Sequence, residues 1–190
     1  YVGDSNLTLT AVIGLLLFTF GLLFKVSAAP FHAWAPDVYQ GAPTAYVGYM
    51  AAIVKTSSFV VLARLFTIIF PLLSIDRSIV FQIISVLSVV LGSFFAITQS
   101  DFKRLIAYSG VAQAGLIFSG IASGGQATIS SLFYLVTYMI QLVGIFIVIS
   151  IVADGFSSTI ELDSLKGILK NYPCLLYTSD AADEGLGVDL

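Results

Sequence analysis

The sequence predicts an all-α fold, a polytopic bundle of transmembrane helices. Its 190 residues are 58% hydrophobic and 10% charged, with a mean hydropathy of +1.00, whereas soluble domains carry roughly 25% charged residues. The apolar residues form five runs, and each run meets or approaches the roughly 20 residues that a helix needs to cross the hydrocarbon of a bilayer. Strands of a β-barrel would be shorter and would alternate in polarity, so these runs are expected to be helices.

The first apolar run covers residues 8–38 and is predicted to be a discontinuous helix. Pro30 lies inside it, removes a backbone donor and clashes with the preceding helical turn. The second run covers residues 43–70 and follows the turn-forming residues Gly41 to Pro43. Connections as short as this one favour antiparallel neighbours, so the predicted helices are expected to pack side by side.

The remaining three runs cover residues 78–98, 104–122 and 127–153. The first and last of these are apolar on nearly every side, as expected of helices that face lipid or lie inside a bundle. Asp76 precedes one of the runs, and Ser100 or Asp101 precedes the next, where each can act as an N-cap.

The loops on one side of the predicted bundle carry more basic residues than those on the other. One side holds Lys103, Arg104, Lys166 and Lys170, against Arg64 and Arg77 on the other side. Cytoplasmic loops carry the excess of lysine and arginine in membrane proteins. The segment after Asp154 is therefore expected in the cytoplasm, and Lys103 and Arg104 are interpreted as interfacial anchors.

The C-terminal residues differ in style from the rest of the chain. After Pro173 the chain reads CLLYTSDAADEGLGVDL, which is residues 174–190 and includes Cys174, its one cysteine. This stretch resembles the translation of an adapter used to prepare sequencing libraries. We therefore predict a transmembrane domain over residues 1–173, treat residues 174–190 as an artefact outside the fold, and expect the genuine sequence to be part of a longer protein.

Lys25 is the first candidate functional residue. It ends an uncharged, mostly apolar run, and the chain then continues with FHAWA, so the lysine is expected deep in the membrane. A lysine at mid-membrane costs at least about 2.5 kcal/mol and usually faces a bundle interior or a water-filled path. The break at Pro30 would open such a path, because transporters use broken helices around ion sites. The alternative is a lysine that snorkels to the surface from a shorter helix.

Lys55 is the second candidate, near the centre of the run 43–70. It lies well over two helical turns from either end, so snorkelling is difficult, and its neighbours are small residues that allow close helix approach. Desolvation disfavours the charged form of a buried lysine, which favours exchange of a proton. The alternative is a structural lysine that anchors a carboxylate from a partner helix. Acidic residues are absent from the five runs apart from Asp37, at the very end of the first.

His32 is the only histidine and follows the predicted helix break, where it could relay protons. The alternative is a packing residue held by hydrogen bonds. A lone histidine does not make a metal site, and no cluster of cysteines or carboxylates accompanies it. The sequence has no phosphate-binding glycine loop and no motif for a nucleotide, flavin or iron–sulfur cluster, and nothing in it indicates nucleic-acid binding. Tyr134, Tyr138 and Gln141 are interpreted as packing residues of the fifth run.

Three stretches resemble the antiporter-like membrane subunits of respiratory complex I, NADH:quinone oxidoreductase. They are FKVSAAPFHAWAPDVYQGAPT (24–44), SDFKRLIAYSGVAQAG (100–115) and ELDSLKGILKNYP (161–173). Within this superfamily, PDVYQGAP resembles the subunit N family, the bacterial counterpart of mitochondrial NADH dehydrogenase subunit two. The resemblance covers about residues 9–173.

The resemblance implies a subunit of fourteen helices, of which this chain would hold about the seventh to the eleventh. In the family a lysine beside the break of the seventh helix matches Lys25, and a protonatable residue of the eighth matches Lys55. These residues are thought to carry protons while other subunits handle NADH, FMN, iron–sulfur clusters and quinone. The acidic partner and a further lysine of the family lie outside this sequence.

The resemblance thus implies a proton-translocating membrane subunit with other complex I membrane subunits and lipid as its partners. The bacterial plasma membrane is the expected location, or the mitochondrial inner membrane if the gene is organellar. A cation/proton antiporter subunit of the same superfamily is the alternative. A structural membrane subunit, in which both lysines only hold helices together, is the third reading.

Overall fold

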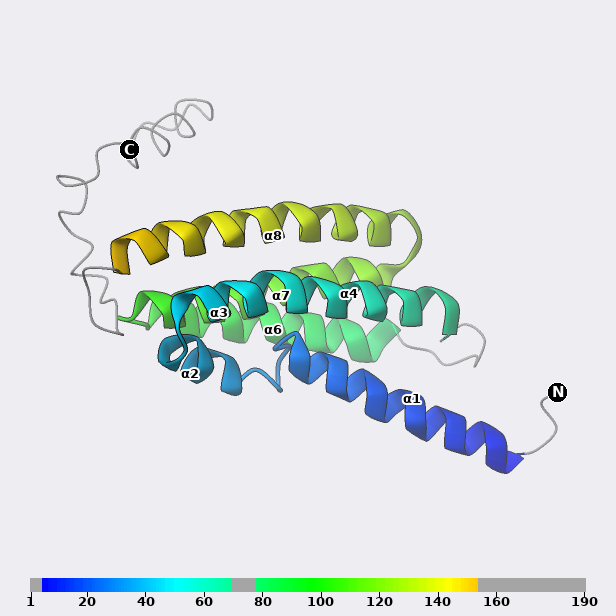
Figure 1. The fold of residues 1–190 in the computed structure, drawn as a ribbon. Coiled ribbons are helices and arrows are strands. Elements are labelled where there is room, and N and C mark those ends of the chain that lie inside the picture. The colour runs from blue at the N-terminus through cyan, green and yellow to red at the C-terminus, as the bar shows by residue number, and fades with distance from the viewer. Residues whose placement is uncertain (1–4, 70–77, 154–190) are drawn as a thin grey trace.

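The computed structural model describes residues 5–69 and 78–153, which form helices and no strand (Figure 1). The α-helices are α1 (Ser5–Lys25), α2 (Trp34–Gly41), α3 (Thr44–Tyr49), α4 (Lys55–Arg64), α6 (Ser78–Ile97), α7 (Phe102–Ser123) and α8 (Gly125–Ala153). Two π-helical turns, η1 (Met50–Val54) and η2 (Leu65–Ile69), lie within the rod that α3 begins. The predicted all-α class is confirmed. The tail at residues 174–190 and the proposed cap Asp76 lie outside the described residues.

Four helices of the described part are long and apolar enough to cross a membrane. They are Thr44–Ile68, Ile79–Ile97, Phe102–Ser123 and Gly125–Ile151. The predicted run 8–38 is divided between α1 and α2, and the apolar stretch Leu9–Lys25 of α1 is shorter than a full span. The break in this run separates α1 from α2.

Asp101 is the N-cap of α7. Its carboxylate accepts a hydrogen bond from the backbone N–H of Arg104 at 3.0 Å, which satisfies one of the free donors at the start of the helix. Of the two cap residues proposed for this helix, the structure selects Asp101, and α7 begins at Phe102.

Helices α6 and α7 form the tightest pair in the bundle. Gly92 of α6 lies against the backbone of α7, and Gly115 of α7 lies against the backbone of α6. Ser85 also donates a hydrogen bond to the carbonyl of Gly115 at 2.6 Å. Small residues let helix backbones approach closely, which supplies packing contact where lipid offers no hydrophobic drive. This pair therefore forms the support for the helices around it.

The core consists of two clusters, one along the C-terminal half of α7 and the other along its N-terminal part. One contains Phe59, Phe66 and Phe118, and the rings of Phe59 and Phe118 meet edge to face at 5.4 Å. The other contains Tyr39 and Phe146 and joins α2 and α3 to α8. Figure 1 shows α3 to η2, α6, α7 and α8 as roughly parallel rods, with α1 extending away from them. Large apolar side chains on α1, α6 and α8 face outward.

Candidate functional site

The first half of the break between α1 and α2 is buried inside protein, whereas Pro30 and Ala33 are exposed. Helix α1 ends at Lys25, and the next four residues, 26–29, are at most 1% exposed. Ser27 has a φ of 60°, and the Ala29–Pro30 peptide bond is cis. Non-helical backbone at membrane depth is tolerated where protein or a water-filled cavity surrounds it. The structure meets this condition and places Pro30 within the break.

Side chains of α6 and α2 satisfy two polar backbone groups at the break, the N–H of Ala29 and the carbonyl of Phe24. The N–H of Ala29 donates to the hydroxyl of Ser88 at 2.9 Å, and this hydroxyl donates to the carbonyl of Ile84 at 2.7 Å. On the other side, the indole of Trp34 donates to the carbonyl of Phe24 at 2.9 Å and stacks on the Phe24 ring. The break is therefore a built feature, held by α6.

Replacing Ser88 with alanine is expected to lower the free energy of unfolding by about 1–3 kcal/mol, because the buried N–H of Ala29 loses its acceptor. Ser123→Ala is the matched control, since that exposed hydroxyl bonds only to the carbonyl of Ser119 in its own helix. Denaturant unfolding of the detergent-solubilised protein measures both variants. An equal loss for the two serines would mean that the contact to Ala29 does not support the break.

Lys55 follows a π-helical turn in the rod that α3 begins. The turn η1 (Met50–Val54) ends directly before it, and α4 starts at the lysine. A π turn inserts one extra residue into a helix and is frequent at functional sites. The inserted residue rotates the following helix by about 100°, because an α-helix has 3.6 residues per turn. The turn therefore determines which face of the rod carries Lys55.

The Lys55 side chain is 5% exposed and lies at the contact of α4 with α7 and α8. Its Nζ donates a hydrogen bond to the backbone carbonyl of Gly110 at 2.9 Å. Among the described residues, no carboxylate lies within ion-pair distance of this amine. The surrounding helices hold the lysine in place, while its charge is left without a counter-ion inside this part of the bundle.

Gly110 allows this contact because it has no side chain. A Cβ atom at Gly110 would lie 3.1 Å from the Nζ of Lys55 and 3.2 Å from the hydroxyl oxygen of Tyr138. Both distances are shorter than ordinary van der Waals contact. The absent side chain thus leaves a space that the amine and the phenol enter from opposite helices, α4 and α8.

Lys25 is the last residue of α1, and its side chain is exposed on the outside of the described bundle. The structure therefore does not bring the two predicted lysines into one buried site. Lys55 lies inside the bundle, and Lys25 lies at the helix break. The acidic partner expected for Lys25 is not among the described residues.

His32 is half-buried between two aromatic rings. Its ring centroid lies 6.3 Å from that of Phe95 on α6 and 6.3 Å from that of Tyr108 on α7. The Nδ1 atom is buried and finds no hydrogen-bond partner in the described part of the chain. The packing interpretation of His32 thus has aromatic contacts in its favour, while the relay role remains a prediction.

One ion pair connects the two long sequence motifs. Arg104, on α7, lies 2.6 Å from the carboxylate of Asp37 on α2, and it donates further hydrogen bonds at 3.0 Å to Gln40 and Gln99. The neighbouring Lys103 is only 4% exposed, and its amine lies 3.4 Å from the carbonyl of Ala42. These two cations therefore fasten the α2–α3 corner to α7, a role that the count of basic residues did not reveal.

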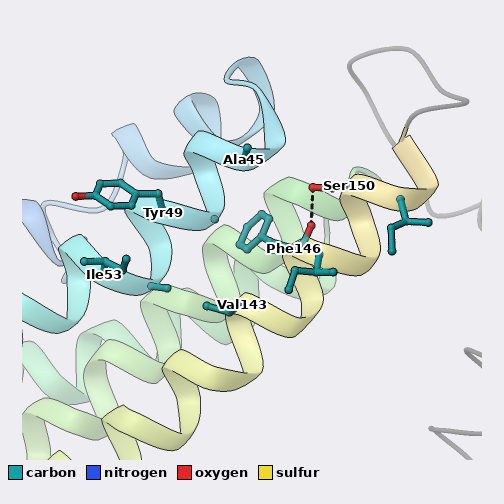
Figure 2. Close-up of a pocket in the computed structure, with 10 residues that line it drawn as sticks. Ala45, Tyr49, Ile53, Val143, Phe146 and Ser150 are labelled. Atoms are coloured by element: carbon teal, nitrogen blue, oxygen red, sulfur yellow. Dashed lines mark hydrogen bonds between the residues drawn. The ribbon is translucent and has the colours of Figure 1, made fainter.

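An open apolar groove of about 350 Å³ lies between the α3–η1 rod and α8. Figure 2 shows Phe146 projecting from α8 toward the α3–η1 rod, which carries Tyr49 and Ile53. The hydroxyl of Ser150 is satisfied by the carbonyl of Phe146 at 2.8 Å. The lining contains no charged group, so this groove is separate from the chemistry of Lys55.

Groups of acidic, histidine or cysteine side chains able to hold a metal are also absent from residues 5–69 and 78–153.

Comparison with known proteins identifies relatives of this chain. The family model described as NADH:quinone oxidoreductase/Mrp antiporter, transmembrane, matches residues 3–179. The chain is 40% identical over 172 residues to NADH-quinone oxidoreductase subunit N of Rhodococcus opacus, covering 90% of this chain and 32% of the relative. It is 36% identical over 173 residues to the chloroplastic NAD(P)H-quinone oxidoreductase subunit 2 of Nephroselmis olivacea, covering 90% and 34%.

A solved structure shares the fold. A chain in respiratory complex I from Thermus thermophilus, solved with bound aureothin, superposes with a TM-score of 0.73 and 34% sequence identity. The match covers 91% of this chain and 36% of that one, so the chain spans about a third of the length of the relatives it matches. The predicted resemblance is confirmed. The chain is an integral membrane protein, and it belongs to the NADH:quinone oxidoreductase/Mrp antiporter transmembrane family.

Proposed function

We propose that this chain is a segment of a subunit N of NADH:quinone oxidoreductase, which couples electron transfer from NADH to quinone to proton movement across the membrane. The relatives that carry this name match along nearly the whole chain. In this proposal the buried lysines carry the protons, and the redox reaction takes place in other subunits. The rest of the subunit and other membrane subunits of the complex complete the path.

The observation that carries the proposal is the position of Lys55. An ionisable side chain inside a membrane protein is expensive, and by default it marks an ion or proton path. Lys55 is almost completely buried, has a single carbonyl as its direct partner, and lies without a carboxylate in the described bundle. A lysine that only held helices together would be expected to pair with an acid.

Lys25 and the helix break are the second part of the proposal. In it, the exposed Lys25 side chain at the end of α1 faces residues contributed from outside this segment, including an acidic partner. The break next to it lets water reach the lysine, and His32 is a further candidate to relay the proton. Two observations support this: residues 26–29 of the break are buried, and the N–H of Ala29 is hydrogen-bonded to Ser88. Transporters use broken helices of this kind around ion sites.

The cofactor and location predictions belong to the same proposal. NADH, FMN, iron–sulfur clusters and quinone would be held by other subunits. Lipid would cover the outward apolar faces of α6 and α8 wherever no other helix does. The plasma membrane of a bacterium is the proposed location, in keeping with the bacterial relatives, which include that of Rhodococcus opacus. A mitochondrial inner membrane would fit an organellar gene.

The experiment that tests this function uses the intact membrane complex that contains the chain, reconstituted in liposomes. NADH and a short-chain quinone are added, and acidification of the vesicle lumen is followed with a pH-sensitive dye. Lumen acidification that requires quinone reduction and continues without sodium is the expected result. A complex that contains the chain but oxidises NADH without moving protons would contradict the proposal.

Cation/proton exchange is the second candidate, because the matching family model also describes Mrp antiporters. The same liposomes distinguish it. An antiporter exchanges protons for sodium when a sodium gradient is imposed, with no need for NADH. Sodium-driven proton movement at full rate in the absence of NADH would favour this candidate.

A further inference from the structure

The hydroxyl of Tyr138 and the amine of Lys55 both approach Gly110, and this hydroxyl has no hydrogen-bond partner among the described residues. Tyr138 is 8% exposed, and among the described residues no hydrogen bond involves its hydroxyl. Although the residue is buried, its hydroxyl oxygen is not among the fully enclosed unpaired polar atoms of the described residues, so a water molecule can reach it. The Tyr138 hydroxyl is therefore available to exchange a hydrogen bond with another group.

Gly110 is the point that both the Lys55 amine and the Tyr138 hydroxyl approach. The amine of Lys55 and the hydroxyl of Tyr138 both lie close to 3 Å from the position that a Gly110 Cβ would occupy, at 3.1 and 3.2 Å. The amine has three donors and uses one on the Gly110 carbonyl. A phenol can both donate and accept, so it complements the donors that remain free.

A second polar pair continues the arrangement one helical turn away. Tyr134 precedes Tyr138 by one turn on α8, and Gln113 follows Gly110 by about one turn on α7, in accord with 3.6 residues per turn. The hydroxyl of Tyr134 donates to the side-chain oxygen of Gln113. Tyr134 is 39% exposed, so the series of polar groups begins at a buried lysine and ends at the surface of the described bundle.

We propose that Tyr138 is a proton-transfer partner of Lys55, and that Tyr134 and Gln113 extend this path toward the turn between α7 and α8. The inference rests on the proposed function, in which Lys55 gains and loses a proton. It assigns to α8 a role in the reaction, whereas the sequence favoured packing for both tyrosines. The path leads away from the end of the bundle that holds the Asp37–Arg104 pair.

No hydrogen bond joins Lys55 to Tyr138 directly, so in this proposal one water molecule bridges them. An Nζ–H bond of the Lys55 ammonium breaks as its proton passes to this water, and an O–H bond forms at the Tyr138 hydroxyl with a proton that the same water gives up. The proton that the phenol carried before passes to a water molecule on the Tyr134 side, so the lysine becomes neutral and the positive charge moves to water. Rotation of the hydroxyl then restores the starting state of Tyr138, since hydroxyl hydrogens turn freely about the C–O bond.

The test compares Tyr138→Phe with Tyr46→Phe in the intact complex, reconstituted in liposomes. Tyr46 is 69% exposed on α3 and serves as a matched loss of one hydroxyl. NADH-driven proton pumping per assembled complex is measured in H2O and in D2O. Tyr138→Phe is expected to slow pumping by about 100-fold, because a positioned proton-transfer group contributes about 10²–10⁴, and to raise the H2O/D2O rate ratio. Tyr46→Phe is expected to match the wild type.

Gly110→Ala is the second variant, and it keeps both polar groups. Its methyl group would lie 3.1 Å from the Lys55 amine and 3.2 Å from the Tyr138 hydroxyl and would displace one or both, so the same slow, isotope-sensitive pumping is expected. Gly144→Ala on α8 is the steric control, because a Cβ there meets nothing within 4 Å. A purely structural role would lower the amount of assembled complex and leave the rate ratio per complex unchanged, which would overturn the inference.

The outcomes separate this inference from the proposed function. If Tyr138→Phe and Gly110→Ala pump at the wild-type rate while Lys55→Met does not pump, the Tyr138 path is wrong and the proposed function stands. If Lys55→Met also pumps normally, the lysine route itself is wrong. Slow pumping with a raised rate ratio in both Tyr138→Phe and Gly110→Ala would establish the path.

Discussion

Replacing Lys55 with methionine is expected to reduce proton pumping by about 100-fold or more, since a positioned acid–base group contributes about 10²–10⁴ to a proton-transfer step. Methionine keeps the length and the apolar stem of the side chain but has no proton to exchange. The measurement is NADH-driven acidification of liposomes that contain the assembled complex. The amount of complex is determined in the same sample, so that a loss of pumping is not confused with a loss of assembly.

The stability of the same variant distinguishes a functional lysine from a structural one. Lys55 is a buried amine whose one direct protein partner in the described bundle is the carbonyl of Gly110. That carbonyl belongs to the interior of α7, so its helical partner remains when the amine is removed. Burying a charge without a counter-ion costs several kcal/mol, and an apolar replacement of similar volume is often neutral or stabilising.

Lys55→Met is therefore expected to unfold at the same denaturant concentration as the wild type or at a higher one, while pumping is lost. A structural lysine predicts the opposite pair of results, with reduced stability and normal pumping in the complex that still assembles. Arg104→Met is a useful comparison because it removes a cation that does have a partner carboxylate, in Asp37. We expect that variant to lose only about 1 kcal/mol of stability through the ion pair, since the Asp37 side chain is 73% exposed and its carboxylate stays hydrated.

The fold class could be predicted from the sequence because the bilayer imposes a simple rule. A span needs about 20 apolar residues with every backbone group satisfied internally, and the chain meets that rule in long runs. The break near Pro30 could also be predicted, because proline removes a backbone donor at a known position. These signals are local, and each depends on a few neighbouring residues.

The features around Lys55 could not be predicted because they depend on contacts distant in the sequence. The π turn at Met50–Val54 has no proline or other visible signal, yet it determines the face on which Lys55 lies. The Gly110 carbonyl is 55 positions further along the chain, and the Asp37–Arg104 pair joins residues 67 positions apart. Only packing brings such groups together, so the sequence indicated the lysine and not its surroundings.

Small residues illustrate the same limit. Gly110 and Ala114, four residues apart on α7, form a small-xxx-small pattern that is typical of close helix packing. In the structure Gly110 makes room for two polar groups, while the closest backbone approach involves Gly92 and Gly115 between α6 and α7. A glycine in an apolar helix predicts that another group packs closely against it. Whether that group is a side chain or a backbone depends on which helices pack together.

Gly92→Ala is expected to be the most destabilising small substitution in the described bundle. An added Cβ would lie 2.5 Å from the backbone nitrogen of Ala112, and 2.9 Å both from the Cα of Ala112 and from the carbonyl oxygen of Tyr108. These are main-chain atoms of α7, so no side chain can rotate away to relieve the clash, and the helices must separate. Overpacking of this kind costs about 3 kcal/mol, and a helix-propensity gain of about 1 kcal/mol for alanine offsets part of it.

The separation of α6 from α7 would also reach the functional site. Ser88 on α6 supports the helix break through the N–H of Ala29, and α7 carries the carbonyl that holds Lys55. Gly92→Ala is therefore expected to lower both the unfolding midpoint of the solubilised protein and the yield of assembled complex. Gly21→Ala on α1 makes the same chemical change where a Cβ meets nothing within 4 Å. It should leave the yield unchanged and raise the midpoint slightly, because alanine favours the helix. Equal midpoints for the two variants would show that α6 and α7 do not pack through Gly92, which would remove the support on which the break and the Lys55 contact depend.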